Sequence, residues 1–236
     1  MGAHTWNRRQ FATALAGAPV AVNGSLLLAP AALAAPGAGT PSVSADQGLQ
    51  MLMDGNKRYV AGRLTSLGNL PQDRAKVVNS QSPFAVVVCC SDSRVPPEIV
   101  FDQTLGQLFV IRTAGQVLDE AARASIMYGV DALKAPLLLV MGHTSCGAVE
   151  AALAALTGGA IPGYAFRFAE GIGPAVASVL NQPGDKLDNA VRANIRMGVE
   201  QLKSAQPVLA PAVSSGQLKV AGGYYDLATG QVSIIA

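Results

Sequence analysis

Two short stretches of the sequence bring reactive side chains close together. The first is Cys89-Cys90-Ser91-Asp92-Ser93-Arg94, which follows the apolar run 84–88. The second is His143-Thr144-Ser145-Cys146, which follows the apolar run 136–141. Thiol, carboxylate and guanidinium groups are costly to bury at a strand end unless they satisfy one another or a metal. The two stretches therefore predict a metal site.

The residue types favour zinc. His143 and Cys146 lie three residues apart where a helix is expected to begin, so both side chains can face one ion. The helix N-terminus also favours the thiolate form of Cys146. With Cys90 from another strand, two thiolates and one imidazole suit Zn²⁺ and leave a fourth tetrahedral position for water. Magnesium and calcium prefer oxygen ligands. We expect one Zn²⁺ per chain.

Cys89 and Cys90 compete for the third ligand position. Neighbouring strand residues face opposite sides, so only one of the two thiols can reach the ion. We expect Cys90, at the exit of the strand, to bind it and Cys89 to be a packed thiol, with a vicinal disulfide as the alternative. A buried free cysteine is often only a small hydrophobic residue. His143 is the only histidine outside the first 34 residues, and its place beside the cysteine stretches favours a metal.

Hydrophobic periodicity and turn residues predict the elements that hold these stretches. Strands are expected over 84–89, 107–112, 136–141, 218–221 and 232–235, and helices over 45–62, 118–133, 146–156, 175–180 and 189–205. Strands that alternate with helices predict an α/β fold with a mostly parallel central β-sheet flanked by helices. Ligands bind at the carboxyl ends of strands in such sheets, where both reactive stretches fall.

The N-terminus has the features of an export leader. Arg8-Arg9, followed two places later by Phe11, resembles a twin-arginine signal, and Ala32-Leu33-Ala34 suits a signal peptidase. Prolines and glycines within the apolar segment argue against a membrane-spanning helix. We therefore predict a twin-arginine-type signal peptide over 1–34, a flexible tether over 35–44 and the zinc domain over 45–236. The mature protein is expected in the periplasm or outside the cell, without stable membrane insertion.

Charge and cysteine content narrow the possible functions. Without Arg8 and Arg9, the seventeen Lys and Arg fall to fifteen and equal the fifteen Asp and Glu. No basic cluster stands out, which argues against nucleic acid as a partner. Three cysteines, an odd number, fit a metal site better than a disulfide framework in an exported protein.

Four motifs together resemble the β-class carbonic anhydrases. They are Gln81-Ser82-Pro83 before the first strand, Cys90-Ser-Asp-Ser-Arg-Val95 at its end, Gly142-His-Thr-Ser-Cys-Gly-Ala148, and Tyr225-Asp226-Leu227 near the C-terminus. The resemblance covers the chain from about Ala45 to its end. It implies zinc ligands at Cys90, His143 and Cys146, and a homodimer or larger homo-oligomer.

The resemblance also implies an activity, the reversible hydration of carbon dioxide to bicarbonate and a proton. Zinc lowers the pKa of its bound water toward ~7. Asp92 is expected to accept the hydrogen of the resulting hydroxide and orient it, while Arg94 holds Asp92 away from the metal by a paired hydrogen bond. The alternative for Asp92 and Arg94 is a structural ion pair that caps the strand end.

Further positions match the family less closely. Gln81 is expected to hydrogen-bond the substrate, with an ordinary loop glutamine as the alternative. Phe109 and Tyr128 are expected to line an apolar pocket, with plain core residues as the alternative. The stretch Ile111–Gln116 matches a family stretch that usually ends in Asn, so Gln116 is a departure. Two other functions fit the same residues: hydrolysis of carbonyl sulfide or carbon disulfide, and non-catalytic zinc or thiol-redox binding.

Overall fold

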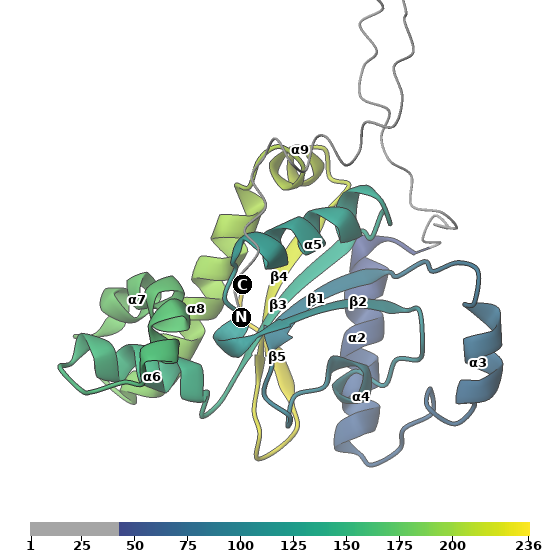
Figure 1. Cartoon of the computed structure of the whole chain (residues 1–236). Helices are drawn as coiled ribbons and strands as arrows, with labels where there is room; N and C mark the ends of the chain where they lie inside the picture. Colours follow the sequence, from purple (N-terminus) through teal and green to yellow (C-terminus); the bar gives the residue numbers. More distant parts are fainter. Residues whose placement is uncertain (1–42) are drawn as a thin grey trace, which may run out of the picture. The chain divides into compact units, whose positions relative to one another are not determined.

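The structure is a computed structural model that describes residues 43–236 (Figure 1). Its centre is a five-stranded sheet in the order β2-β1-β3-β4-β5. The first four strands are parallel and β5 is antiparallel to β4, so the predicted mostly parallel α/β fold is confirmed. The strands are β1 (Ala85–Cys90), β2 (Leu108–Thr113), β3 (Leu137–His143), β4 (Lys219–Tyr225) and β5 (Val232–Ile234).

Helices cover both faces of the sheet, as Figure 1 shows. Helices α5, α8 and α9 pack on one face and α2 and α4 on the other, while α6 and α7 pack on each other and on α8. The helices are α2 (Ala45–Val60), α3 (Leu70–Lys76), α4 (Pro97–Val100), α5 (Glu120–Asp131), α6 (Gly147–Leu156), α7 (Phe166–Val179), α8 (Lys186–Lys203) and α9 (Leu209–Ser214), with short 3₁₀ turns η1 (Ala114–Gln116) and η2 (Gly163–Ala165).

The hydrophobic core forms around β1 and β3, whose residues are buried throughout. Val86 and Val88 of β1 face α5, whereas Ala85 and Val87 face the α2 side. Strands buried on both faces read as continuous apolar runs, which is why both were recognisable in the sequence. The same burial holds the carboxyl ends of the two strands rigidly side by side.

Most predicted elements are present, with ends shifted by a few residues. The exception is the segment 157–188, where a short helix was expected near 175–180. The structure has the longer helix α7, which continues through Pro174. Its apolar residues Ile172 and Val176 are fully buried. Burial of this stripe outweighs the helix-breaking tendency of proline and the nearby glycines. The short helices α3, α4 and α9 were not predicted.

Residues 43 and 44, which were predicted to belong to the tether, make contacts with the domain. Ser44 caps α2 by accepting a hydrogen bond from the Gln47 N–H, and Gln47 accepts one in return from the Ser44 N–H. Val43 packs against the core. The predicted signal peptide and residues 35–42 of the predicted tether lie outside the described residues.

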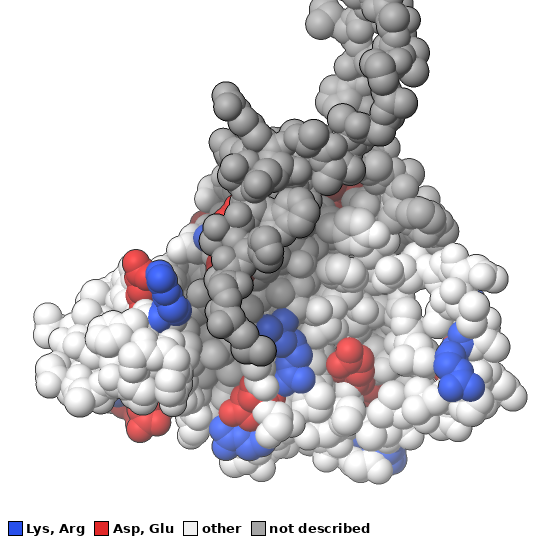
Figure 2. All heavy atoms as spheres, in the orientation of Figure 1, with Lys and Arg blue, Asp and Glu red and all other residues white. Residues whose placement is uncertain are grey.

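On the face drawn in Figure 2, acidic and basic side chains lie interspersed and most of the visible described surface is uncharged. Within residues 43–236, no helix combines the length and the apolar character needed to cross a bilayer.

Candidate metal centre

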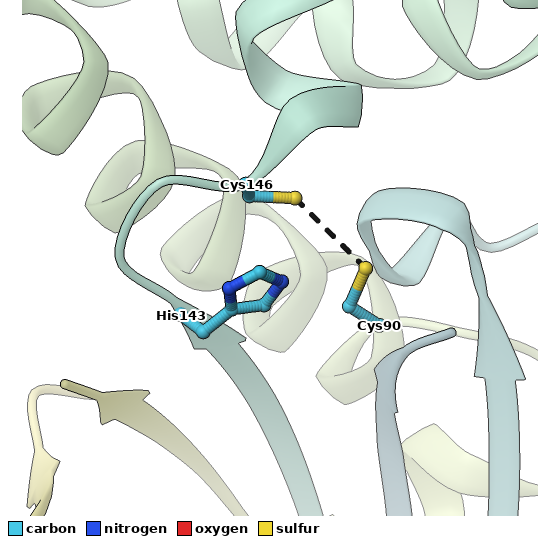
Figure 3. A group of neighbouring side chains, drawn as sticks. All are labelled: Cys90, His143 and Cys146. Carbon is cyan, nitrogen blue, oxygen red and sulfur yellow. Dashed lines mark hydrogen bonds between the residues drawn. The ribbon is translucent and has the colours of Figure 1, made fainter. Parts of the chain in front are cut away.

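The three predicted ligands converge at the carboxyl edge of the sheet (Figure 3). Cys90 is the last residue of β1, His143 the last of β3, and Cys146 the N-cap of α6. Their ligand atoms all lie within 4.8 Å of one another. The two Sγ atoms are 3.9 Å apart, close to the separation of about 3.8 Å that two thiolates on one tetrahedral zinc require. The predicted convergence of these three residues is confirmed.

The histidine is oriented for metal binding. Its Nδ1 lies 2.8 Å from the carbonyl oxygen of Thr144, so this nitrogen carries the proton and donates it. Nε2 is then the nitrogen available to a metal, and among the described residues it has no hydrogen-bond partner although the side chain is buried. An unpaired buried acceptor is costly unless something binds it. A cation between His143, Cys90 and Cys146 would remove this cost.

The two thiols of the site influence each other's ionisation. Contact with the Cys146 thiol lowers the pKa of Cys90, against the effect of burial, and His143 and the Gly115 amide act in the same direction. The same contact raises the pKa of Cys146, although the backbone amides of Val149 and Ala148 oppose the rise. The closeness of the two sulfurs thus makes it harder to ionise both thiols than to ionise one. A divalent cation stabilises both thiolates together, as the donor set of a zinc site requires.

Cys89 is separated from this site by the alternation of the strand. Its side chain is fully buried in the core, and burial raises the pKa of its thiol to about 12. All three cysteines are free. Cys89 is therefore a packed, unreactive thiol in this structure, and Cys90 is the residue that joins His143 and Cys146.

Asp92 and Arg94 form a paired interaction at the edge of the site. The Arg94 Nε and Nη2 atoms donate to the two carboxylate oxygens of Asp92 at 2.9 and 2.7 Å, and the Arg94 backbone N–H donates to Oδ1 at 2.9 Å. These bonds hold the pKa of Asp92 well below its usual range. Asp92 Oδ2 lies 3.9 Å from His143 Nε2. The carboxylate thus stands beside the ligands while its oxygens are occupied by Arg94.

The loop that carries the ligands is shaped by tight packing and local hydrogen bonds. A Cβ on Gly142 would meet Ile195 Cγ1 at 2.7 Å, so only glycine fits before His143. The Thr144 hydroxyl accepts from the Leu227 N–H at 3.0 Å, and Ser145 turns the chain with a positive φ of 52°. This turn brings Cys146 back toward β1.

The structure adds two residues to the site that the sequence analysis did not select. Arg112, at the end of β2, donates to the carbonyl oxygens of Cys90 and Asp92 and so fixes the loop after β1. The Gly115 N–H donates to Cys90 Sγ at 3.3 Å. Both belong to the Ile111–Gln116 stretch, whose resemblance to the family was the available signal. Gln116 itself is buried with a φ of 47°, a conformation that suits Asn better than Gln.

The three predicted substrate contacts lie away from the metal ligands within one chain. Gln81 is exposed before β1, at the opposite end of that strand from Cys90. Phe109 of β2 pairs with Val86 of β1. Val86 lies four residues before Cys90, which places this pair roughly 13 Å from Cys90 along the strand. Tyr128 is 43% exposed and packs against Phe109, with ring centroids 5.9 Å apart. A single chain does not bring these three residues to the metal centre.

Fold and ligand set together define an α/β protein with a Cys₂His metal centre suited to zinc. The carbonic anhydrase family model matches residues 85–232. A carbonic anhydrase of Mycolicibacterium smegmatis is 40% identical over 184 residues, which cover 78% of this chain and 89% of that protein. Carbonic anhydrase 2 of Mycobacterium tuberculosis is 39% identical over 181 residues, covering 76% of this chain and 87% of the relative.

Solved structures show the same relationship. A Coccomyxa β-carbonic anhydrase in complex with acetazolamide shares 27% identity at a TM-score of 0.63, covering 79% of this chain and 86% of that one. The chain belongs to the carbonic anhydrase family, and its fold is that of the β class. It is therefore an enzyme of the lyase type.

Proposed function

We propose that this protein catalyses the reversible hydration of carbon dioxide to bicarbonate and a proton at the Cys90–His143–Cys146 centre. The observation that carries the proposal is the Asp92–Arg94 pair, which stands 3.9 Å from the free Nε2 of the histidine ligand. A purely structural zinc site closes its fourth position with a protein ligand. Here the carboxylate of Asp92 lies 3.9 Å from His143 Nε2, but it accepts two hydrogen bonds from the Arg94 side chain.

Zinc held by the two thiolates and the imidazole would supply a Lewis acid that makes water reactive near neutral pH. Asp92 remains ionised over the working range because Arg94 lowers its pKa, so it can accept a hydrogen bond from the attacking water. Arg94 keeps both carboxylate oxygens aligned and prevents Asp92 from turning onto the metal. The Arg94 side chain is 54% exposed and that of Asp92 18%, so the pair borders the solvent-facing side of the site.

The direct test is a stopped-flow hydration assay of the zinc-loaded protein with a pH indicator. Carbon dioxide hydration well above the buffer rate, lost on chelation and restored by zinc, supports the proposal. Sulfide release from carbonyl sulfide or carbon disulfide with negligible carbon dioxide hydration would instead assign the same centre to those gases. No turnover of any of the three by a fully zinc-loaded protein leaves a binding function.

We further propose that the enzyme works as a homodimer or a larger homo-oligomer. Gln81, Phe109 and Tyr128 can contact substrate only if a second copy brings them to a metal centre, and β2, which carries Phe109, lies at the sheet edge. Light scattering after gel filtration tests this directly. A fully active monomer would rule it out and would remove the three residues from the substrate site.

Residues 1–34 are proposed to direct export by the twin-arginine route. The paired Arg8 and Arg9 support this, because that route depends on the arginine pair. Replacing both by lysine is expected to leave unprocessed precursor in the cytoplasm, which fractionation and immunoblotting would show. Unchanged export of the double variant would point to a different leader.

A further inference from the structure

A second set of contacts reaches the metal centre from behind Cys90. The Gly115 N–H, in the η1 turn, donates to Cys90 Sγ at 3.3 Å. Hydrogen bonds to a ligating sulfur withdraw charge from it, and such outer contacts set both the affinity for the metal and its electronic properties. The direction of this one N–H therefore affects how strongly Cys90 donates to the metal.

The turn that aims this N–H has an uncommon backbone conformation. Gly115 and Gln116 both have positive φ, 62° and 47°, and a non-glycine residue there is disfavoured. A Cβ on Gly115 would meet Ile172 Cδ1 at 2.6 Å and Ala148 Cβ at 3.0 Å. The turn thus fits closely against α6 and α7 and depends on outside contacts to keep its shape.

One of those contacts comes from a polar side chain buried in the core. Asn194, in α8, is 5% exposed and donates from Nδ2 to the Gly115 carbonyl oxygen at 3.0 Å. The Gly115 carbonyl and the Gly115 N–H belong to the two peptide groups that flank the same Cα. Only the two backbone torsions of Gly115 separate these groups, so holding the carbonyl restricts how far the N–H can turn away from Cys90 Sγ.

We propose that Asn194 is a positioning residue of the metal centre, which holds Gly115 so that its N–H stays directed at the Cys90 sulfur. Asn194 acts through Gly115 and touches neither metal nor substrate. Asn194 lies in α8, 79 residues after Gly115 in the sequence, and so links that helix to the ligand at the end of β1. The inference rests on the proposed metal centre, and its readouts do not depend on carbon dioxide hydration.

The test uses the full chain with Asn194→Leu, loaded with cobalt(II) or with zinc. A thiolate that loses a hydrogen bond becomes richer in electrons, so its charge-transfer band to cobalt is expected to move to lower energy. Zinc affinity, measured by competition with a chelator, is expected to fall 10- to 100-fold, because the loss of a fixed orientation for Cys90 outweighs the stronger donation of its sulfur.

Asn56→Leu is the matched control. Asn56 is also a buried asparagine, 2% exposed, and makes three hydrogen bonds, to Val100 O, to Gly230 O and from Val232 N, none of them with a metal ligand. It should destabilise the fold while leaving the cobalt band and the zinc affinity unchanged. A purely structural role of Asn194 predicts that the two variants behave alike.

The outcomes separate the inference from the proposed function. An unchanged band and affinity in folded Asn194→Leu overturn the inference and leave the metal centre intact. If that variant does not fold, Asn194→Ala, which only removes atoms, is judged by the same two readouts.

In the cadmium-113 wild-type protein, a scalar coupling between the metal and the Gly115 amide proton is also expected, and its absence would refute the hydrogen bond from Gly115 to the ligating sulfur. Wild-type protein that shows no thiolate band with cobalt refutes both proposals.

Discussion

At the scale of single residues, the site depends on which atoms are already engaged. His143 uses Nδ1 for the Thr144 carbonyl, which leaves Nε2 to face the two sulfurs. Asp92 uses both oxygens for Arg94, and we propose that this keeps it from serving as a ligand. Hydrogen bonding thus separates the groups that can hold the metal from the group that can orient a reacting water.

Asp92→Asn tests the second of these roles. The amide keeps the shape of the side chain but loses its charge and one acceptor, so kcat/KM for carbon dioxide hydration is expected to fall by about 100-fold or more. Zinc content, measured by elemental analysis, should stay at one per chain. Asp54→Asn, which disrupts an exposed pair with Lys57 on α2, is the control and should retain full activity. Equal activity of wild type and Asp92→Asn would mean that the Asp92–Arg94 pair is only a structural ion pair that caps the end of the strand.

At the scale of elements, a buried carboxylate joins α2 to the segment that follows α4. Asp102 is fully buried and accepts hydrogen bonds from Arg58 of α2 and from the backbone N–H groups of Thr65 and Ser66. Burial alone would raise the pKa of Asp102, but these bonds outweigh it and leave the pKa lowered. Asp102 lies two residues after the end of α4, and α4 itself begins only three residues after Arg94.

Asp102→Asn is therefore expected to lower the free energy of unfolding by about 2 kcal/mol near pH 7, as for loss of a buried charge-assisted hydrogen bond. Because the folded pKa lies below the unfolded value of 3.8, this stabilisation is present above that pH and is lost as the pH falls through the folded pKa. Urea titrations should show that the difference in the free energy of unfolding between wild type and variant disappears below about pH 4. A gap that is constant with pH would mean that the lost contacts, and not the charge, explain the effect.

At the scale of the whole molecule, the metal ligands tie together parts of the chain that are far apart in sequence. Cys90 and Cys146 are separated by 56 residues. Cys90 ends β1 and Cys146 comes shortly after β3, and these two strands are neighbours in the interior of the sheet. A ligand that binds only the folded state stabilises it by mass action. Zinc should therefore act on global stability as well as on catalysis.

Removing zinc tests this coupling. With free zinc at about 1,000 times its Kd, binding contributes about 4 kcal/mol, which corresponds to a rise in Tm of about 10 °C for a domain of this size. Calorimetry before and after dialysis against a chelator measures the change. Cys90→Ala lacks a ligand and should melt at the same temperature in both conditions. A Tm of wild type that does not depend on zinc would argue against a bound metal.

Much of the fold was predictable because its signals are local. The continuous apolar runs of β1 and β3 and the helical spacing of the apolar residues in α2 predicted those elements. Helix α7 was mostly missed because the burial of Ile172 and Val176 against α6 and α8 overcomes the signal of Pro174. That burial is a property of the assembled domain, which no window of sequence contains.

For the metal site too, some features follow from local sequence and others only from the tertiary structure. The sequence by itself determined the ligand types and the preference for Cys90 over Cys89, because a strand alternates its faces and a parallel sheet gathers its carboxyl ends at one edge. Only the tertiary structure decided how the ligands are held: by Arg112 on the loop after β1, by the Gly115 N–H on the sulfur, and by Asn194 from α8. These contacts join segments distant in sequence, so their existence depends on how the helices pack and not on any local pattern.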